Sequence, residues 1–178
     1  ITIYKIDQKL ADSQKKQGRV LATGQAVGKR IGTGKVRLYR TYSEVLEGKR
    51  ELRKLLESGM SMEEISSELS VFEEGDVLVT EMTTPDWEPL MKQASLIITR
   101  KGGRTSHAAI IAREFGIPAI VGCSDAMDLP NFATVTGSCA EGDTGYVYSV
   151  KVPVELEEVS VDEDSVLTTR INLNVGFP

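Results

Sequence analysis

The residues best suited to chemistry lie in one short segment, TRKGGRTSH at residues 99–107, which ends in His107, the one histidine of the chain. An unprotonated imidazole is a good nucleophile near neutral pH. The chain carries a formal net charge of −5, yet four basic residues cluster in or near this segment: Arg100, Lys101, Arg104 and Arg113. A histidine within such local positive charge is suited to handling phosphate.

The predicted position of this segment favours the same chemistry. An apolar strand, SLIITR, precedes it, and a helix capped by Thr105 or Ser106 follows. The first turn of a helix offers unpaired backbone N–H groups and the positive end of the helix dipole, which attract anions. The dipole disfavours the imidazolium form of His107 and stabilises a phosphoryl group bound to it. Gly102 and Gly103 permit a sharp turn and the close approach of a second molecule.

Other uses of His107 compete with this hypothesis. A histidine near a helix start can simply cap the helix or hydrogen-bond within the fold, and the residues alone leave this role open. Zinc binding is disfavoured because there is no second histidine, and Cys123 and Cys139 form no C-x-x-C pair. These cysteines are expected to be buried, reduced thiols. Ser106 is a poor partner for His107, because adjacent helical residues do not face each other.

The elements that must position the segment alternate between strand and helix over residues 74–122. Strands are predicted in EEGDVLVTEM, SLIITR and AIVG, and a short helix with Pro85 or Pro89 near its start is predicted in PDWEPLMKQA. The His107 helix is predicted to end at Gly116. A strand, a crossover helix and a further strand predict parallel pairing. ATVTGS and GYVYSV predict a hairpin, so the expected fold class is α/β, with a mixed, partly parallel sheet and flanking helices.

The first third of the chain is predicted to contain a linker, two strands and a helical pair. The polar stretch up to Gly18 suits a linker, with order beginning near Arg19. Strands are predicted at about residues 19–23 and 35–39. The glycines between and within them fit no phosphate-loop pattern and are expected to form turns. Residues 44–72 have helical periodicity broken at Gly59, and Ser61 with Glu64 forms a capping box for the second helix.

Composition excludes several classes of function. The 178 residues with 40% hydrophobic content suffice for one core of ordinary size. The negative net charge argues against nucleic acid as a partner. Apolar runs are far shorter than the ~20 residues that a membrane span needs, and the first residues lack the apolar stretch of a signal peptide. We therefore expect a soluble, cytoplasmic protein with no membrane partner.

The segment TRKGGRTSHAAIIAREFGIPAIVG strongly resembles the phosphohistidine segment of the phosphoenolpyruvate (PEP)-utilising enzymes. This family includes PEP synthase, pyruvate phosphate dikinase, enzyme I of the sugar phosphotransferase system and rifampin phosphotransferase. The flanking stretches EMTTPDWEPLM and SCAEGDTGYVY resemble the PEP synthase (pyruvate, water dikinase) branch. GQAVGKRIGTGKVR is also similar, so the resemblance covers the larger part of the chain.

The resemblance implies a swivelling β/β/α-type phosphohistidine domain in which His107 is phosphorylated. The residues that match the supporting, phosphate-binding part of the motif are Gly102, Gly103, Arg104, Thr105 and Ser106. The full enzyme is expected to convert ATP, pyruvate and water to AMP, PEP and phosphate. It is expected to bind ATP and Mg²⁺ mainly outside this chain, which should hold no metal site. Thr105 matches a threonine that a regulatory kinase/phosphorylase modifies, and a phosphate there would occupy the anion site.

The resemblance also implies an arrangement of domains. Residues 1–18 would be a linker from an ATP-grasp domain, and residues 19–150 the swivelling domain with a helical insertion at about 44–72. Residues 151–178 would be an acidic linker and the start of a TIM barrel. These two neighbouring domains are the expected partners, and this chain alone should not turn over substrate. Two alternatives remain: a related phosphotransferase (pyruvate phosphate dikinase or an antibiotic phosphotransferase), or a non-catalytic interaction module that docks through the helical pair.

Overall fold

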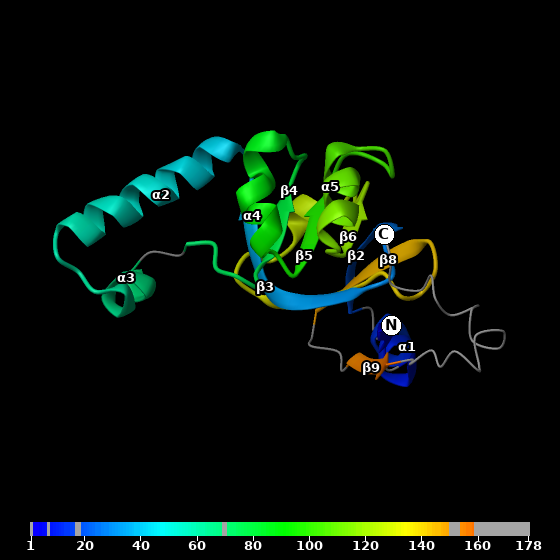
Figure 1. Ribbon diagram of the computed structural model, residues 1–178. Coiled ribbons are helices and arrows are strands. Elements are labelled where there is room, and N and C mark those ends of the chain that lie inside the picture. Colours follow the sequence, from blue (N-terminus) through cyan, green and yellow to red (C-terminus); the bar gives the residue numbers. More distant parts are fainter. Residues whose placement is uncertain (1, 7, 17–18, 69–70, 150–153, 159–178) are drawn as a thin grey trace, which may run out of the picture.

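Parallel and antiparallel strands form one sheet that closes on itself (Figure 1). The computed structural model describes residues 2–6, 8–16, 19–68, 71–149 and 154–158. Its barrel strands are β2 (Val20–Val27), β3 (Ile31–Tyr39), β4 (Val77–Thr80), β5 (Leu96–Thr99), β6 (Ala119–Val121), β7 (Thr134–Ser138) and β8 (Thr144–Tyr148). The other elements are β1 (Thr2–Ile6), β9 (Val154–Glu158), α1 (Gln8–Lys16), α2 (Tyr42–Glu57), α3 (Met62–Glu68), α4 (Glu88–Gln93), α5 (His107–Phe115) and the 3₁₀ turns η1 (Pro85–Trp87) and η2 (Ala126–Asp128).

The barrel follows the order β2-β6-β5-β4-β3-β7-β8, and β8 pairs back with β2. The strands β3, β4, β5 and β6 pair in parallel, whereas β2 with β6, β3 with β7 and β7 with β8 pair antiparallel. The predicted mixed sheet with flanking helices is therefore confirmed, as is the hairpin of β7 and β8. Closure into a barrel was not predicted.

The central parallel strands are buried on both faces. In β4 and β5, Val77, Val79 and Ile98 belong to the core inside the barrel. Leu78 and Ile97 alternate with them and belong to a second core, which the helices α4 and α5 cover (Figure 1). Burial on both faces explains why these strands are continuous apolar runs rather than alternating ones.

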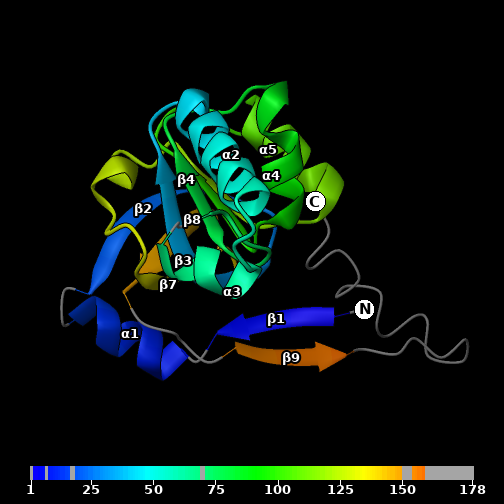
Figure 2. The same ribbon diagram turned by 90° about the vertical axis from the view of Figure 1, so that its left-hand side faces the viewer.

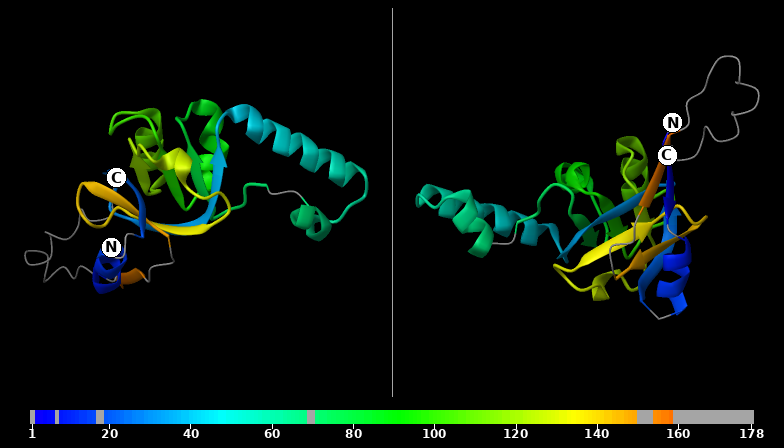
Figure 3. Two further views of the ribbon diagram at one scale, coloured as in Figure 1. Left: turned by 180° about the vertical axis from the view of Figure 1, so that it is seen from behind. Right: turned by 90° about the horizontal axis from the view of Figure 1, so that it is seen from below.

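The predicted helical pair corresponds to α2 and α3, which extend away from the barrel (Figures 1 and 3). The helix α2 buries only Val45, in its first turn. After it ends, Gly59 adopts a φ of 91°, which other residues rarely tolerate. The predicted capping box is confirmed: the Ser61 amide donates to Glu64 Oε2 at 3.1 Å, and the Glu64 amide donates to Ser61 Oγ at 3.3 Å.

The glycine-rich stretch is mostly strand, so the expectation of turns there was wrong at three of four positions. Gly28 is in the β2–β3 turn with a φ of 80°, as expected. Gly24, Gly32 and Gly34 instead lie inside β2 and β3, where neighbouring backbone approaches closely. A Cβ on Gly32 would lie 2.1 Å from the Ser95 carbonyl oxygen. These glycines make room within the barrel rather than turning the chain.

Ordered structure also begins earlier than Arg19, contrary to the expectation. The strand β1 pairs antiparallel with β9, and the two form a ribbon beside α1 (Figure 2). The helix α1 buries Ala11 and Gln14 against the barrel. The buried residues of α1 are thus one small and one polar side chain rather than large apolar ones. The hydrophobic periodicity of the sequence therefore did not indicate a packed helix.

Several predictions lie outside the described residues, including the strand TRINLNVGFP and much of the acidic stretch that precedes it. In the part of the chain that is described, no helix is both long and apolar enough to cross a membrane.

Candidate functional site

The candidate site is built on the start of α5, which Ser106 caps. Ser106 Oγ accepts a hydrogen bond from the Ala109 amide at 3.4 Å and donates one to the Gly103 carbonyl at 2.6 Å. Ser106, and not Thr105, is therefore the cap. At the other end, Gly116 adopts a left-handed φ of 67°, which confirms the predicted end of the helix.

The loop before the helix depends on Gly102. Its φ is +100°, and a Cβ there would lie 2.9 Å from the Ser106 Cβ. A larger residue would therefore be strained in its backbone and would collide with the capping serine. Gly103 holds the same turn through its carbonyl, which also accepts from the Ser106 amide at 3.0 Å.

Both ring nitrogens of His107 have a partner from another part of the chain. Nδ1 is 2.8 Å from Thr83 Oγ1, and Nε2 is 3.4 Å from Glu88 Oε1. Thr83 is 5% exposed, whereas the side chains of His107 and Glu88 are 26% and 36% exposed. Nδ1 is thus held by a buried hydroxyl, whereas the partner of Nε2 is a partly exposed side chain.

The sheet topology brings these partners to His107. The strands β4 and β5 are parallel neighbours in which Thr80 pairs with Thr99, so both carboxyl ends meet at one edge of the sheet. Thr83 follows β4, and Glu88 is the first residue of α4. The sequence of this stretch predicted a strand, a short helix and a family resemblance, but neither Thr83 nor Glu88 was predicted as a site residue. The tendency of ligand sites to gather at the carboxyl ends of neighbouring strands was the signal that could have found them.

A cavity of about 210 Å³ opens beside the imidazole ring. Its lining comes from the ends of β4 and β5 and from the start of α5, and includes Met82, Thr83, Gly102 and His107. Met82 is 55% exposed at its rim. The ring therefore borders a hollow that an approaching group could enter.

Two of the basic residues near His107 are engaged by Glu81 instead. Arg100 Nε lies 2.7 and 2.8 Å from the two oxygens of Glu81, and Lys101 Nζ lies 3.5 Å from Oε1. The hydrogen bonds from Arg100 lower the pKa of Glu81, and the same contact raises the pKa of Arg100. Glu81 thus offsets part of the positive charge that the sequence placed here.

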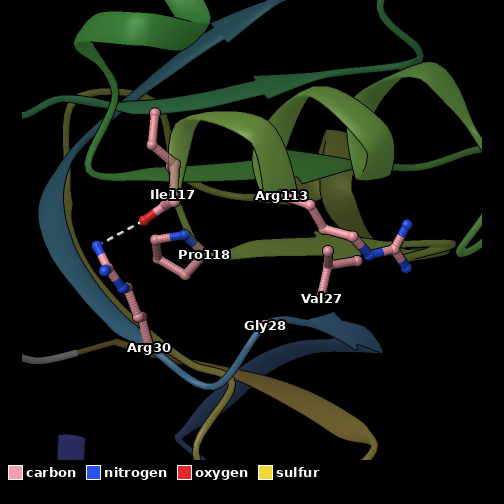
Figure 4. A pocket seen from close by; sticks show the side chains of 7 residues that line it. Val27, Gly28, Arg30, Arg113, Ile117 and Pro118 are labelled. Carbon is pink, nitrogen blue, oxygen red and sulfur yellow. Dashed lines mark hydrogen bonds between the residues drawn. The ribbon is translucent and has the colours of Figure 1, made fainter. Parts of the chain in front are cut away.

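The other two basic residues line a different cavity, of about 180 Å³, near the β2–β3 turn. Arg104 Nη2 lies 3.3 Å from Asp143 Oδ1, and Arg113 Nη1 donates to the Arg104 carbonyl at 2.6 Å. Figure 4 shows Arg113 pointing away from Arg30, which donates to the Gly116 carbonyl at 2.7 Å. Among the described residues, none of the four basic side chains forms a hydrogen bond with His107.

The remaining features to describe are Thr105, the two cysteines and the grouping of possible metal ligands. Thr105 is exposed, and no hydrogen bond of its hydroxyl occurs within the described ranges. Cys123 and Cys139 are buried and unpaired, as predicted, and burial raises their pKa to about 11 and about 12. Among described residues, no three His, Cys, Asp or Glu side chains are grouped so that they could hold a metal ion.

Fold and site together define a class: a mixed α/β barrel that presents a single histidine on a helix start at the carboxyl edge of its parallel strands. More particularly, the chain belongs to the family described as "PEP-utilising enzyme, mobile domain", whose sequence model matches residues 72–164.

Curated relatives are much longer than this chain. The phosphoenolpyruvate synthase of Neisseria meningitidis is 46% identical over 160 residues, which cover 89% of this chain and 17% of that protein. That of Aquifex aeolicus is 40% identical over 179 residues, covering 100% of this chain and 18% of that protein. A solution structure of enzyme I is 28% identical with a TM-score of 0.36, covering 58% of this chain and 37% of that one. Because the Aquifex match covers the whole chain, it includes the helical pair of α2 and α3.

Proposed function

We propose that this chain is the phosphoryl-carrying domain of a phosphoenolpyruvate synthase, with His107 as the residue that carries the phosphoryl group. The whole enzyme would convert ATP, pyruvate and water to PEP, AMP and phosphate. The observation that carries the proposal is the position of His107 in the first turn of α5, with Nδ1 held by a buried hydroxyl and Nε2 beside a partly exposed side chain. Family membership and the named relatives support it.

Nε2 is the atom we assign to the transfer, because Nδ1 is occupied by the buried hydroxyl of Thr83. The lone pair of Nε2 attacks the β-phosphorus of ATP as the P–O bond to AMP breaks, and the electron pair of that bond leaves on the AMP oxygen. Water takes the γ-phosphoryl group, which leaves as phosphate. At the second centre the Nε2–P bond breaks and phosphorus bonds to the enolate oxygen of pyruvate. The N-terminal end of α5 favours the added negative charge.

The supporting residues contribute unequally to this proposal. Gly102, Gly103 and Ser106 shape the turn that presents the ring. Arg104 contacts Asp143 and would have to leave that contact to reach a phosphate on His107. In this proposal Mg²⁺ is bound mainly by other parts of the enzyme.

The partners in this proposal are the other domains of a longer polypeptide. An ATP-grasp domain would precede residues 1–18, a TIM barrel would begin within 151–178, and residues 19–150 would move between them. Such an enzyme would act in the cytoplasm. The short span of the chain within its relatives supports the presence of further domains.

Thr105 is the proposed site of regulation. It is exposed, lies two residues before His107, and is not needed as the helix cap. A phosphate on Thr105 would bring about two negative charges to the helix start that phosphohistidine requires. A regulatory kinase/phosphorylase is the class of partner that would use it.

Labelling of the full-length enzyme with radioactive ATP tests the proposed function. Wild-type enzyme should gain an acid-labile, alkali-stable label on His107 and pass it to pyruvate, while His107→Ala should gain none. Asp86→Asn, a change at an exposed residue nearby, is the matched control and should label normally. A His107→Ala enzyme that still accepts the label would refute the proposal, and transfer to an acceptor other than pyruvate would favour a related phosphotransferase.

A further inference from the structure

The cavity beside the β2–β3 turn has no part in the proposed phosphoryl transfer, and we call it the basic cavity. Its volume is about 180 Å³, and its charged lining residues are Lys29, Arg104, Arg113 and Asp143. Among the described residues, none lines both this cavity and the one beside His107. Three cations and one carboxylate thus meet here, on a chain whose formal net charge is −5. The basic cavity is a local region of positive charge on an acidic protein.

Three separate segments supply the cations of the basic cavity. Lys29 lies in the β2–β3 turn, Arg104 precedes the start of α5, and Arg113 lies in the last turn of that helix. Figure 4 shows the Arg113 side chain extending beside Val27, at the end of β2. Arg113 Nη1 also donates to the Arg104 carbonyl at 2.6 Å, which ties the helix to the loop before it. The fold, and not a run of basic residues in the sequence, brings these charges together.

Most of this positive charge is not neutralised by the protein. Within the described ranges, neither Lys29 nor Arg113 forms an ion pair with a carboxylate, and the acceptor for Arg113 is an uncharged carbonyl. Arg104 Nη2 lies 3.3 Å from Asp143 Oδ1, but the Asp143 side chain is 87% exposed. An ion pair so open to solvent contributes little free energy, so an anion from solution can compete for Arg104.

Two glycines leave the backbone open around the basic cavity. Gly28 has a φ of 80° and Gly142 a φ of 100°, and a Cβ on either would meet no other described atom within 4 Å. Both glycines line the cavity. An anion held by the cations can therefore approach the backbone of both turns without meeting a side chain at these positions.

We propose that the basic cavity binds the phosphate group of a small anion. Arginine offers a planar fork of donors that matches phosphate, and lysine adds a compact positive charge. The volume of about 180 Å³ is below the roughly 300–1,000 Å³ of cavities that enclose drug-sized ligands. The cavity therefore fits inorganic phosphate, pyrophosphate or the phosphate end of a nucleotide, but not a whole nucleotide. This site is separate from Nε2 of His107, so the inference does not rest on the proposed function.

Asp143 gives the proposal a test with a definite sign. A bound anion must take the place of its carboxylate at Arg104, so removal of this negative charge should strengthen binding. Asp143→Asn keeps the shape of the side chain and the backbone carbonyl, which accepts from the Ala26 amide at 2.8 Å. Arg113→Gln removes a guanidinium from the cavity and should weaken binding. A cavity that bound no anion would show neither change.

The test is protection of the Lys29 amine from an amine-reactive reagent, followed by mass spectrometry as pyrophosphate is added. The 178-residue chain itself is used, so that the nucleotide site proposed elsewhere in the enzyme does not contribute. Pyrophosphate should slow the modification of Lys29 in a saturable way. Lys54, an exposed residue on α2, is the internal reference and should be unaffected. Sodium chloride at the same ionic strength controls for screening and should protect neither lysine.

The variants should shift the half-protecting concentration of pyrophosphate in opposite directions. Arg113→Gln should raise it about tenfold, because charge-assisted hydrogen bonds to the anion are lost. Asp143→Asn should lower it about threefold, in line with the small free energy of an exposed ion pair. Arg53→Gln, at an exposed position on α2, is the matched control and should behave as wild type. Thermal unfolding shows that each variant is folded.

Inorganic phosphate and AMP, used in place of pyrophosphate, identify the source of the phosphate group. Protection by AMP at lower concentration than by phosphate would assign the phosphate end of a nucleotide, and protection by phosphate and pyrophosphate alone would assign a free anion. Absence of protection by all three, equal protection of Lys29 by chloride, or wild-type protection in Arg113→Gln would overturn the inference. Labelling of His107 is measured separately in the full-length enzyme, so failure of the proposed function would leave this result intact.

Discussion

At the scale of single residues, the geometry of His107 depends on a hydroxyl from the segment that follows β4. Thr83 is buried and its Oγ1 lies 2.8 Å from Nδ1, so it fixes the orientation of the ring. A ring held at one nitrogen presents the other in a constant direction. This favours reaction at two different centres, because the reactive atom need not search for its position each time.

Thr83→Val tests this role with a side chain of nearly the same shape. We expect the rate of His107 labelling to fall about tenfold because the ring loses its orienting partner, and stability to fall by about 1 kcal/mol. Thr84→Val is the matched control, since Thr84 is exposed and makes no side-chain cap bond. Single-turnover labelling and thermal unfolding measure the two effects. Equal labelling rates in both variants would show that the hydroxyl does not orient the ring.

The residues that sequence reasoning placed correctly are those whose role is local. Ser106 was one of two predicted caps, and Gly116 was the predicted end of the helix, because capping involves residues within one turn. Thr83 and Glu88 lie outside that range and reach His107 only through the pairing of β4 with β5. The contacts of Arg100 with Glu81 are also long-range, so the expected positive face was offset by a residue that the local pattern did not include.

At the scale of elements, the barrel depends on glycines inside its strands. The parallel strands β4, β5 and β6 could be anticipated from buried apolar runs and a crossover helix. Closure could not, because it depends on β2 pairing with both β6 and β8, contacts between segments far apart in sequence. Glycine at a strand position and glycine at a turn look alike in sequence. Only the neighbouring backbone distinguishes Gly32 from Gly28.

Gly32→Ala and Gly48→Ala are predicted to change stability in opposite directions. At position 32 the new methyl group would lie 2.1 Å from the Ser95 carbonyl oxygen, which is backbone and cannot rotate away. We expect a loss of about 3 kcal/mol. Gly48 lies inside α2 with no atom within 4 Å of its added Cβ. Alanine there should stabilise the helix by about 0.5–1 kcal/mol.

Chemical denaturation of the two variants beside wild type measures these free energies. A Gly32→Ala protein as stable as wild type would mean that β3 is not packed against Ser95 as described. The Gly48→Ala variant also serves as the control for any general effect of replacing glycine with alanine.

At the scale of the whole molecule, three parts differ in how firmly they join the barrel. The helices α4 and α5 share a large apolar core with it, whereas α2 buries only Val45. The β1–β9 ribbon joins the barrel beside α1, whose contact combines the small apolar cluster of Ala11 and Tyr148 with a polar cluster around Glu141. In the proposed carrier function, this attachment would transmit motion of the ribbon to the barrel.

The charge of Glu141 is predicted to hold α1 in place. Its carboxylate accepts from Lys15 Nζ at 2.9 Å and from the Tyr148 hydroxyl at 2.8 Å. Burial raises the pKa of Glu141, but these hydrogen bonds outweigh burial and hold the pKa below its ordinary value of 4.5. A carboxyl whose pKa is lowered by folding stabilises the fold when ionised. That contribution is complete above about pH 4.5 and is lost as pH falls through the folded-state pKa.

Glu141→Gln should therefore lower stability by about 1 kcal/mol at pH 7, because Lys15 and Tyr148 lose a charged acceptor. The difference from wild type should shrink as pH falls through the lowered pKa of Glu141, where the wild-type carboxyl also becomes neutral. Hydrogen exchange should show the loss first in α1, because the other cores do not depend on this cluster. Glu114→Gln, at an exposed position on α5, is the control and should change nothing at either pH. A difference that grows as pH falls would contradict the assigned direction of the Glu141 shift, and equal stability at pH 7 would show that α1 is held by its apolar contacts alone.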